Sequence, residues 1–163
     1  MKRAVKPALY VVVLTLVVLI VDQLVKAAVL ATLTPGEPVY LIGRWFKFLL
    51  VFNSGAAFSM GSNSTWLFTT IQIAFIAIAY LYFVPRLTST AEAVGLGLIA
   101  GGAAGNLVDR LFRPPAFFVG HVVDYISVGR FAIFNIADAA ITCGVVLMVA
   151  ALIWESRQEE SQP

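Results

Sequence analysis

Four long apolar stretches dominate the chain, and each is long enough to cross a membrane as a helix. They span residues 7–31, 66–84, 93–112 and 131–154. The second stretch has nineteen residues without a charge, and as a helix it would measure about 28 Å, close to the thickness of a bilayer core. The pattern predicts an all-α membrane protein, a four-transmembrane-helix bundle, and we expect residues 1–163 to form a single membrane-embedded domain.

The first stretch follows a basic N-terminus, as the apolar part of a secretory signal sequence does. It continues past Asp22 and Lys26 without a clear small-residue cleavage site, so we interpret it as the first membrane span. Composition favours a membrane protein, because 60% of the residues are hydrophobic and only 12% are charged. The net charge is +2 and no long basic run is present, so we expect no nucleic-acid partner.

The polar residues of the spans converge on one membrane face. Successive helices alternate in direction, so the end of the first span, the end of the third and the start of the fourth lie on the same side. These positions carry Asp22, Lys26, Asn106, Asp109, Arg110, Asn135 and Asp138. The long connecting segments, residues 32–65 and 113–130, lie on this side too and add Asn53, His121 and Asp124. Ionisable groups near hydrocarbon are costly, so their convergence indicates a functional site.

The basic residues give a mixed signal for the orientation in the membrane. The side with the tails carries Lys2, Arg3, Lys6, Arg86 and Arg157. The side with the long connecting segments carries Arg44, Lys47, Arg113 and Arg130. We give most weight to the cluster beside the first span, which places both termini in the cytoplasm and the polar face outside it.

The first long connecting segment has a pattern of its own. From Val39 to Phe52 it is rich in Val, Ile, Leu, Phe and Trp, with Gly43 as a break, which predicts short strands. The run Arg-Trp-Phe-Lys at residues 44–47 suits the lipid headgroup zone, so we expect these strands at the membrane surface. They would either cradle a substrate or serve only as an interfacial anchor, and the sequence leaves both interpretations open.

The sequence spacing of several polar and small residues indicates structural roles. Asp22 and Lys26 are spaced i and i+4 on one helix, so they can neutralise each other as an ion pair. Asp109 and Arg110 are adjacent and therefore point in different directions, and we expect them to pair with other elements and hold the bundle. The glycine-rich run 95–105 has small residues at helix-packing spacing, which favours close helix contacts over phosphate binding.

Asp124 and Asp138 differ from the other acids, because each is flanked by apolar residues with no basic neighbour in sequence. Two carboxyl groups brought together in such surroundings cannot both ionise easily and would share a proton, one as base and one as acid. Paired aspartates of this kind activate water and protonate a leaving amine. On spacing and flanks alone, a catalytic pair, a proton relay and buried polar contacts all remain open.

Other catalytic chemistries fit the residues less well. A serine mechanism would combine Ser54 or Ser59 with His121, the only histidine, but no Gly-x-Ser-x-Gly motif is present. A zinc peptidase would need several nitrogen or sulfur ligands, whereas Cys143 is the single cysteine and no His-Glu-x-x-His motif occurs. We therefore expect neither a metal nor another cofactor.

Two further functions remain as rivals. A small transporter or proton channel would use Asp22, Asp109 and Asp138 as a relay, although the inner halves of the spans carry few polar groups. A structural subunit of a larger complex would account for the helix rich in small residues. It would leave the loop asparagines and the isolated aspartates without a role.

Five sequence blocks follow one another along the chain. They are Asp22-Gln23 with Lys26, Asn53-Ser-Gly-Ala-Ala-Phe-Ser59, Gly101-Gly-Ala-Ala-Gly-Asn-Leu-Val-Asp-Arg110, Val122-Val-Asp-Tyr125 and Phe134-Asn-Ile-Ala-Asp138. With these blocks the sequence resembles the bacterial lipoprotein signal peptidases, also called signal peptidase II, over most of its length. The resemblance implies a four-helix bundle with a small extracytoplasmic β-rich cradle in the bacterial cell membrane.

The resemblance also implies an activity, that of an aspartic endopeptidase. Such an enzyme removes the signal peptide from prolipoproteins by hydrolysing the bond N-terminal to a diacylglyceryl-modified cysteine. By the family pattern Asp124 and Asp138 form the catalytic dyad, the same two aspartates that their flanks single out. The residues that would shape the site and hold the dyad and substrate are Asp22, Lys26, Asn53, Asn106, Asp109, Arg110 and Asn135. We expect diacylglyceryl-modified prolipoproteins and membrane lipid as partners, and an enzyme that acts as a monomer.

Overall fold

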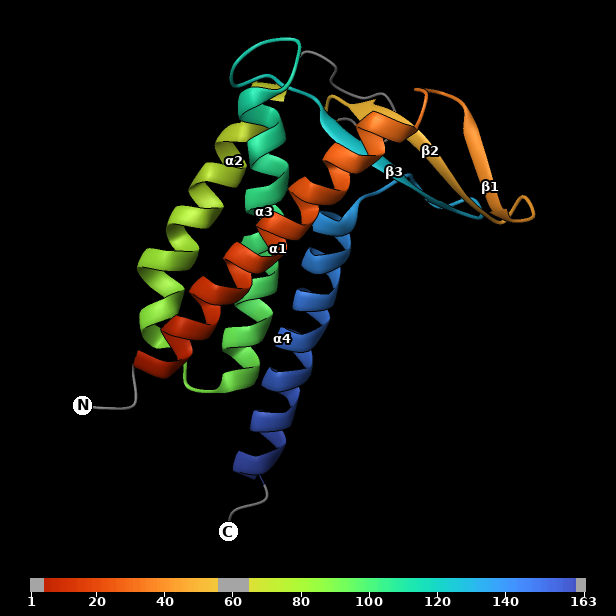
Figure 1. The fold of residues 1–163 in the computed structure, drawn as a ribbon. Coiled ribbons are helices and arrows are strands. Elements are labelled where there is room, and N and C mark those ends of the chain that lie inside the picture. The colour runs from red at the N-terminus through yellow and green to blue at the C-terminus, as the bar shows by residue number, and fades with distance from the viewer. Residues whose placement is uncertain (1–4, 56–64, 161–163) are drawn as a thin grey trace.

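The structure, a computed structural model, describes residues 5–55 and 65–160 of the chain. Four long helices stand side by side, and a small sheet projects from one end of the bundle (Figure 1). The helices are α1 (Val5–Thr32), α2 (Thr65–Ile78), α3 (Thr90–Phe112) and α4 (Ile136–Glu160). The second helix continues through two short turns, the π-helical η2 (Ala79–Phe83) and the 3-10 turn η3 (Val84–Arg86). The strands are β1 (Pro38–Ile42), β2 (Phe46–Asn53) and β3 (Val122–Val128).

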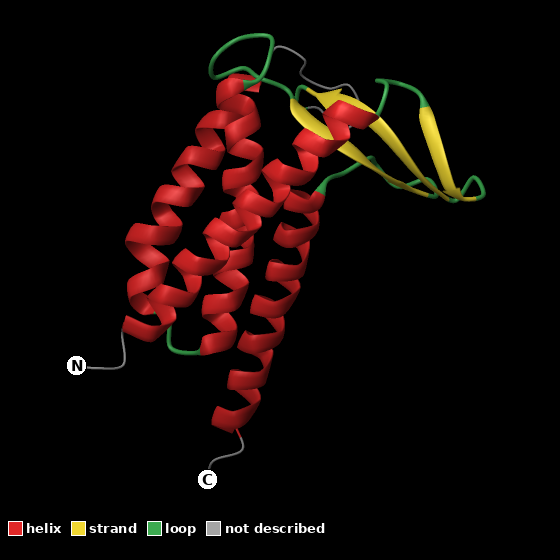
Figure 2. Cartoon of the chain, in the orientation of Figure 1, coloured by secondary structure: helices red, strands yellow, loops and turns green. Residues whose placement is uncertain are grey.

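The helices are long and apolar enough to cross a membrane four times, over Pro7–Thr32, Thr65–Arg86, Thr90–Phe112 and Ile136–Trp154. The predicted fold class, a four-helix membrane bundle with a small β-rich part, is confirmed (Figure 2). The predicted start of the fourth helix at residue 131 is wrong. Phe134 exchanges two backbone hydrogen bonds with Ile126 of β3, so the chain is still extended there and α4 begins only afterwards.

Helix α3 is the most buried of the four spans and contacts α1, α2 and α4. Glycines allow the close approach of its neighbours. A side chain at Gly102 would collide with the backbone of Ala137 in α4. A side chain at Gly101 would collide with Thr15 and Val18 in α1. The other three helices carry many exposed large apolar side chains, as expected of surfaces that contact lipid.

The sheet is antiparallel, with the strand order β1-β2-β3, so the strands expected in the first long connecting segment are present. Val123 and Tyr125 of β3 form a buried cluster with Leu50 of β2 and pack against side chains near the end of α1. Because side chains alternate along a strand, Asp124 points to the opposite side from these two neighbours. The sheet thereby anchors β3 on the helix bundle and leaves Asp124 available for polar contacts.

Replacing Gly102 with alanine tests the close packing of α3 on α4. The added methyl group would overlap the carbonyl oxygen of Ala137, so the two helices must move apart. We expect a loss of about 1–3 kcal/mol of stability, measured as a lower unfolding temperature in detergent. Ala150→Val, which adds volume at an exposed position of α4, is the control and should unfold close to the original temperature. An unaltered unfolding temperature of Gly102→Ala would contradict this packing.

Candidate active site

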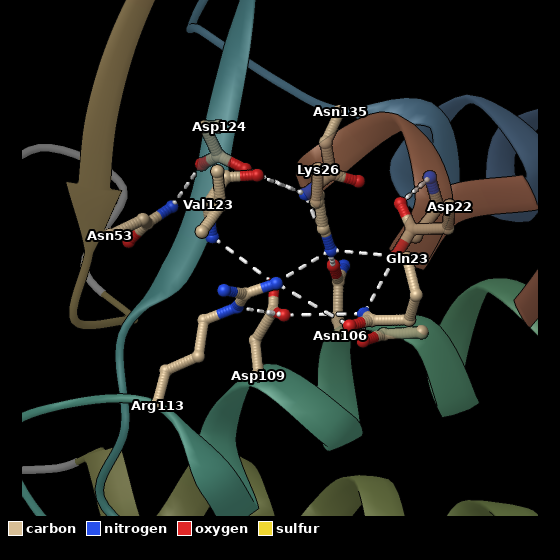
Figure 3. Close-up of polar contacts among 12 residues, drawn as sticks. Asp22, Gln23, Lys26, Asn53, Asn106, Asp109, Arg113, Val123, Asp124 and Asn135 are labelled. Carbon is tan, nitrogen blue, oxygen red and sulfur yellow. Dashed lines mark hydrogen bonds and ion pairs between the residues drawn. The ribbon is translucent and has the colours of Figure 1, made fainter. Parts of the chain in front are cut away.

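A buried ion network joins α1 to α3 at the end of the bundle that carries the sheet (Figure 3). The ammonium of Lys26 lies 2.8 Å from a carboxylate oxygen of Asp22 and 2.7 Å from one of Asp109. It also donates a hydrogen bond of 2.9 Å to the side-chain oxygen of Asn106. The three charged side chains are fully buried. The expected pair of Asp22 and Lys26 therefore forms, and Lys26 also pairs with Asp109.

Asp109 connects this network to strand β3. One of its carboxylate oxygens accepts the backbone N–H of Val123, the residue before Asp124, at 3.2 Å. Its other oxygen accepts hydrogen bonds from the side chains of Gln23 and Arg113. Neither residue was among the site residues predicted from the sequence. Arg113 follows Asp109 by four residues, and this helical spacing is the signal that could have identified it. Asp109 thus pairs with other elements, as expected.

The N-terminus of α4 holds Asp138 in a reciprocal cap. The side-chain oxygen of Asn135 accepts the backbone N–H of Asp138 at 3.0 Å, and a carboxylate oxygen of Asp138 accepts the backbone N–H of Asn135 at 3.1 Å. This is the capping-box arrangement, with aspartate in place of the usual glutamate or glutamine. Asp22 of α1 accepts a further N–H of this turn, that of Ala137, at 3.1 Å. These bonds set the position of the Asp138 carboxyl group.

Asn106 links the buried lysine to Asp138. Its side-chain oxygen accepts from Lys26, and its amide nitrogen donates to a carboxylate oxygen of Asp138 at 2.8 Å. Because an ammonium group can only donate, Lys26 determines which end of the amide faces which partner. The same amide oxygen accepts a hydrogen bond of 3.0 Å from the side chain of Asn135. Lys26 therefore orients Asp138 through one intervening side chain.

Asp124 receives hydrogen bonds from two asparagines. Asn53 donates to one carboxylate oxygen at 2.8 Å, and Asn135 donates to the other at 2.7 Å. Asp124 is only 2% exposed, and this burial, together with the charge of Asp138, raises the pKa of Asp124 to about 6 against the opposing effect of the two asparagines. Both aspartates contact Asn135, and neither forms an ion pair within the described parts of the chain. Asp124 and Asp138, the two acids distinguished by their apolar sequence neighbours, therefore both contact Asn135 in the folded chain.

Arg110 is buried beside this pair, with 6% of its surface exposed. Its guanidinium group lies over the ring of Phe68 in α2, 5.4 Å from the ring centre. The carboxylates whose charges act on it are those of Asp124, Asp109 and Asp138. Two of its nitrogens, Nε and Nη1, have no hydrogen-bond partner among the described residues. A cation with such donors near two carboxyl groups can bind a carbonyl oxygen or a developing negative charge.

Two of the residues considered for a serine mechanism are His121 and Ser59. His121 lines a cavity with Phe52, Pro114 and Pro115. Ser59 lies outside the described residues. Across residues 5–55 and 65–160, no three His, Cys, Asp or Glu side chains gather in a way that could hold a metal ion. The groups that do meet at this end of the bundle can supply acid–base chemistry by paired carboxyl groups.

Replacing Lys26 with methionine tests the buried network. The variant keeps an apolar stem of similar length but leaves Asp22 buried without a cation and Asp109 paired with Arg113 alone. We expect a loss of about 3–5 kcal/mol of stability, measured by denaturant unfolding in detergent. Lys47→Met, which removes an ammonium group from strand β2, is the control and should have a much smaller effect. Equal stability of Lys26→Met and the unchanged protein would show that this network does not hold the helices.

A family model described as signal peptidase (SPase) II matches residues 14–154 of the chain. The lipoprotein signal peptidase of Rhodococcus jostii is 48% identical over 133 residues, which is 82% of this chain and 67% of that relative. For the lipoprotein signal peptidase of Mycolicibacterium smegmatis the identity is 48% over 134 residues, 82% of this chain and 57% of the relative. For that of Mycobacterium tuberculosis H37Rv it is 45% over 138 residues, 85% of this chain and 68% of the relative.

Solved structures share the fold. One described as a bacterial membrane enzyme has a TM-score of 0.78 at 28% sequence identity, and the match covers 94% of this chain and 93% of that one. A second with the same description has a TM-score of 0.75 at 30% identity, covering 87% and 91%. Because the family model reaches from the first helix to the fourth, and relatives named for this activity share almost half of the aligned residues, the chain belongs to the signal peptidase II family.

Proposed function

We propose that the chain is a membrane aspartic endopeptidase that removes the signal peptide from prolipoproteins, with Asp124 and Asp138 as its catalytic pair. The bond cleaved would be the one N-terminal to a diacylglyceryl-modified cysteine, as the resemblance to signal peptidase II implies, and the relatives are named lipoprotein signal peptidases. One observation carries the proposal: both carboxyl groups bind Asn135 and have no cationic partner among the described residues. Two such groups are suited to sharing one proton.

In the proposed reaction, a water molecule between the two carboxyl groups attacks the scissile carbonyl carbon. The ionised carboxylate takes a proton from the water as the C–O bond forms, and the protonated carboxyl donates its proton to the carbonyl oxygen. The C–N bond then breaks, the leaving amine takes the proton that came from water, and the new acid returns the other proton to the pair. Burial favours Asp124 as the initial proton donor, since its pKa is raised to about 6. Asp138, which is less buried, would begin as the base.

The surrounding residues support this chemistry by their positions. Asn53 and Asn135 hold the two oxygens of Asp124. Asn106 holds one oxygen of Asp138. The guanidinium nitrogens of Arg110 that lack a partner among the described residues would donate to a carbonyl oxygen of the substrate. Each reacting group would then be oriented before the substrate arrives, which lowers the barrier without any movement of the framework.

We further propose that both termini lie in the cytoplasm and that the dyad lies at the extracytoplasmic face of a bacterial cell membrane. The basic cluster beside α1 supports this orientation. The diacylglyceryl group would keep the substrate in the bilayer and bring its cysteine to the membrane surface. One chain provides all the residues of the proposed site, so a monomer suffices.

A proton relay through the bilayer has less support, because it needs titratable groups along the membrane depth. The carboxylates within the four spans are Asp22, Glu92, Asp109 and Asp138. Three of them are at the sheet end of the bundle, whereas Glu92 is in the first turn of α3 at the opposite end and forms a capping box with Ser89. Residues 7–21, 93–108 and 139–154 carry no carboxylate, and neither does the second span, so no acidic group lies between the two ends to pass a proton.

Replacing Asp124 or Asp138 with asparagine tests the catalytic pair. Each variant keeps the shape of the side chain but removes a carboxyl group that must exchange a proton, so we expect cleavage to fall by at least about a hundredfold. The measurement follows the two fragments of a synthetic peptide with an S-diacylglyceryl cysteine by mass spectrometry, with the purified protein in detergent.

Glu37→Gln makes the same chemical change at an exposed position before β1 and should cleave at the original rate. The peptide without the diacylglyceryl group should stay intact with every variant. If both aspartate variants keep substantial activity, the pair is not catalytic. If the unchanged protein cleaves lipidated and unlipidated peptides equally, the proposed substrate class is wrong.

A further inference from the structure

An apolar cavity of about 480 Å³ opens beside Asp138. Its wall comes from the segment before α4 and from the first turns of that helix, and includes Phe131, Phe134, Asp138, Ala139, Thr142 and Cys143. The carboxyl of Asp138 is the one charged group among its lining residues. The cavity therefore joins the proposed catalytic pair to an apolar space of the size that ligand pockets usually have.

The cavity extends along α4 in the direction of the bilayer. The span of α4 begins at Ile136, and Cys143 lies about 7.5 Å further along the helix axis than Asp138. Thr142 and Cys143 are both exposed, so this end is open to the surroundings of the helix. The Thr142 hydroxyl donates to the backbone oxygen of Asp138 at 2.9 Å and needs no partner in the cavity. The path from the carboxyl group into the lipid is thus apolar.

Two aromatic rings form part of the cavity wall. Phe131 and Phe134 pack edge to face with their ring centres 5.9 Å apart. Phe131 is 71% exposed, so a ligand or lipid that covered its ring would remove apolar surface from water. Its position next to Asp138 makes a ligand of the catalytic site a suitable cover.

Two further cavities lack this connection. One of about 400 Å³ is lined by Phe52, Pro114, Pro115 and His121. Another, of about 360 Å³, lies between the end of α1 and the sheet, where Phe48 and Tyr125 line it. Neither has Asp124 or Asp138 in its wall. Of these three cavities, the one on α4 is the one with a carboxyl group of the proposed dyad in its wall.

We propose that this cavity is the subsite for an acyl chain of the substrate's diacylglyceryl group, which enters beside Asp138 and runs along α4 past Cys143. The inference rests on the proposed function and deepens it. The lipid is attached through the side chain of the cysteine whose N-terminal bond is cut, so the glycerol lies only a few bonds from the atoms on which the dyad acts. A flexible apolar chain must leave that point toward the bilayer, and this cavity provides the route.

Occupation of the cavity would also contribute to catalysis. The acyl chain gains its binding energy at a distance from the reacting atoms, and that energy can hold the scissile bond against the two carboxyl groups. A peptide without the lipid would leave the cavity empty and would be poorly positioned. Selectivity for lipidated precursors would then arise from α4 and the segment before it, without contacts to particular side chains of the precursor.

Alkylation of Cys143 tests the proposal in the unchanged protein. It is the only cysteine of the chain, so its reaction with a maleimide in detergent reports on this cavity alone. We expect a saturating peptide that begins with S-diacylglyceryl cysteine to slow the reaction by at least about fivefold. The sulfur of the lipidated peptide is a thioether, so the peptide itself does not react with the maleimide. The unlipidated peptide of the same sequence should leave the rate unchanged. Equal protection by both peptides, or protection by neither, would overturn the proposal.

A substitution that fills the cavity provides a second test. Cys143→Trp should raise KM for the lipidated peptide by about tenfold or more while kcat changes less, because the lost contacts bind the chain and not the reacting atoms. Val145→Trp, at an exposed position of α4 on another face of the helix, is the matched control and should keep the original KM. An unchanged KM for Cys143→Trp would overturn the subsite.

The acyl-chain subsite and the proposed function can be disproved separately. If Cys143 is not protected by the lipidated peptide while Asp138→Asn abolishes cleavage, the subsite is wrong and the proposed function stands. If Asp124→Asn and Asp138→Asn both cleave normally, the proposed function itself is wrong, whatever happens at Cys143.

Discussion

A lysine ammonium buried between two carboxylates holds the functional end of this bundle together. Removing a charge from water costs several kcal/mol, so Lys26 is stable in the interior only because Asp22 and Asp109 lie 2.8 and 2.7 Å from it. Asp22 and Lys26 come from α1, and Asp109 comes from α3. A slip of one helix along the other would leave a buried charge without its partner, so the network sets the register of α1 against α3.

Two contacts lead from this network to the two aspartates of the proposed dyad. Asn106 accepts from Lys26 and donates to Asp138, while Asp109 holds the backbone of Val123 beside Asp124. Lys26 and Arg113 neutralise Asp22 and Asp109. The carboxyl groups of Asp124 and Asp138 accept hydrogen bonds from asparagine side chains instead. Such hydrogen bonds orient a carboxyl group without keeping it ionised. A pair that transfers protons needs this freedom, because each carboxyl group must both gain and lose a proton.

Much of the fold could be predicted from local pattern, because a membrane span needs only length and continuous apolar character. The alternation of helix direction also puts the polar residues on one face. Residues 131–134 are as apolar as a span, but Phe131 and Phe134 form backbone hydrogen bonds with β3, so the true start of α4 depends on contacts outside the local pattern. For the same reason helical spacing finds the partner of Lys26 in Asp22 but not in Asp109. The contact of Asn135 with Asp138 is local, since the two residues are three apart at the start of α4, whereas its contact with Asp124 arises only from folding. The catalytic roles come from the family pattern.

Sharing of one proton by Asp124 and Asp138 can be measured by infrared titration of protein labelled with ¹³C-aspartate, because protonated carboxyl and carboxylate groups absorb at different frequencies. Asp124→Asn identifies the Asp124 band by its loss. In the unchanged protein Asp124 should titrate with a pKa of about 6. In Asp138→Asn the neighbouring negative charge is absent, so the pKa of Asp124 should fall. A titration of Asp124 that is the same in both proteins would contradict the pairing.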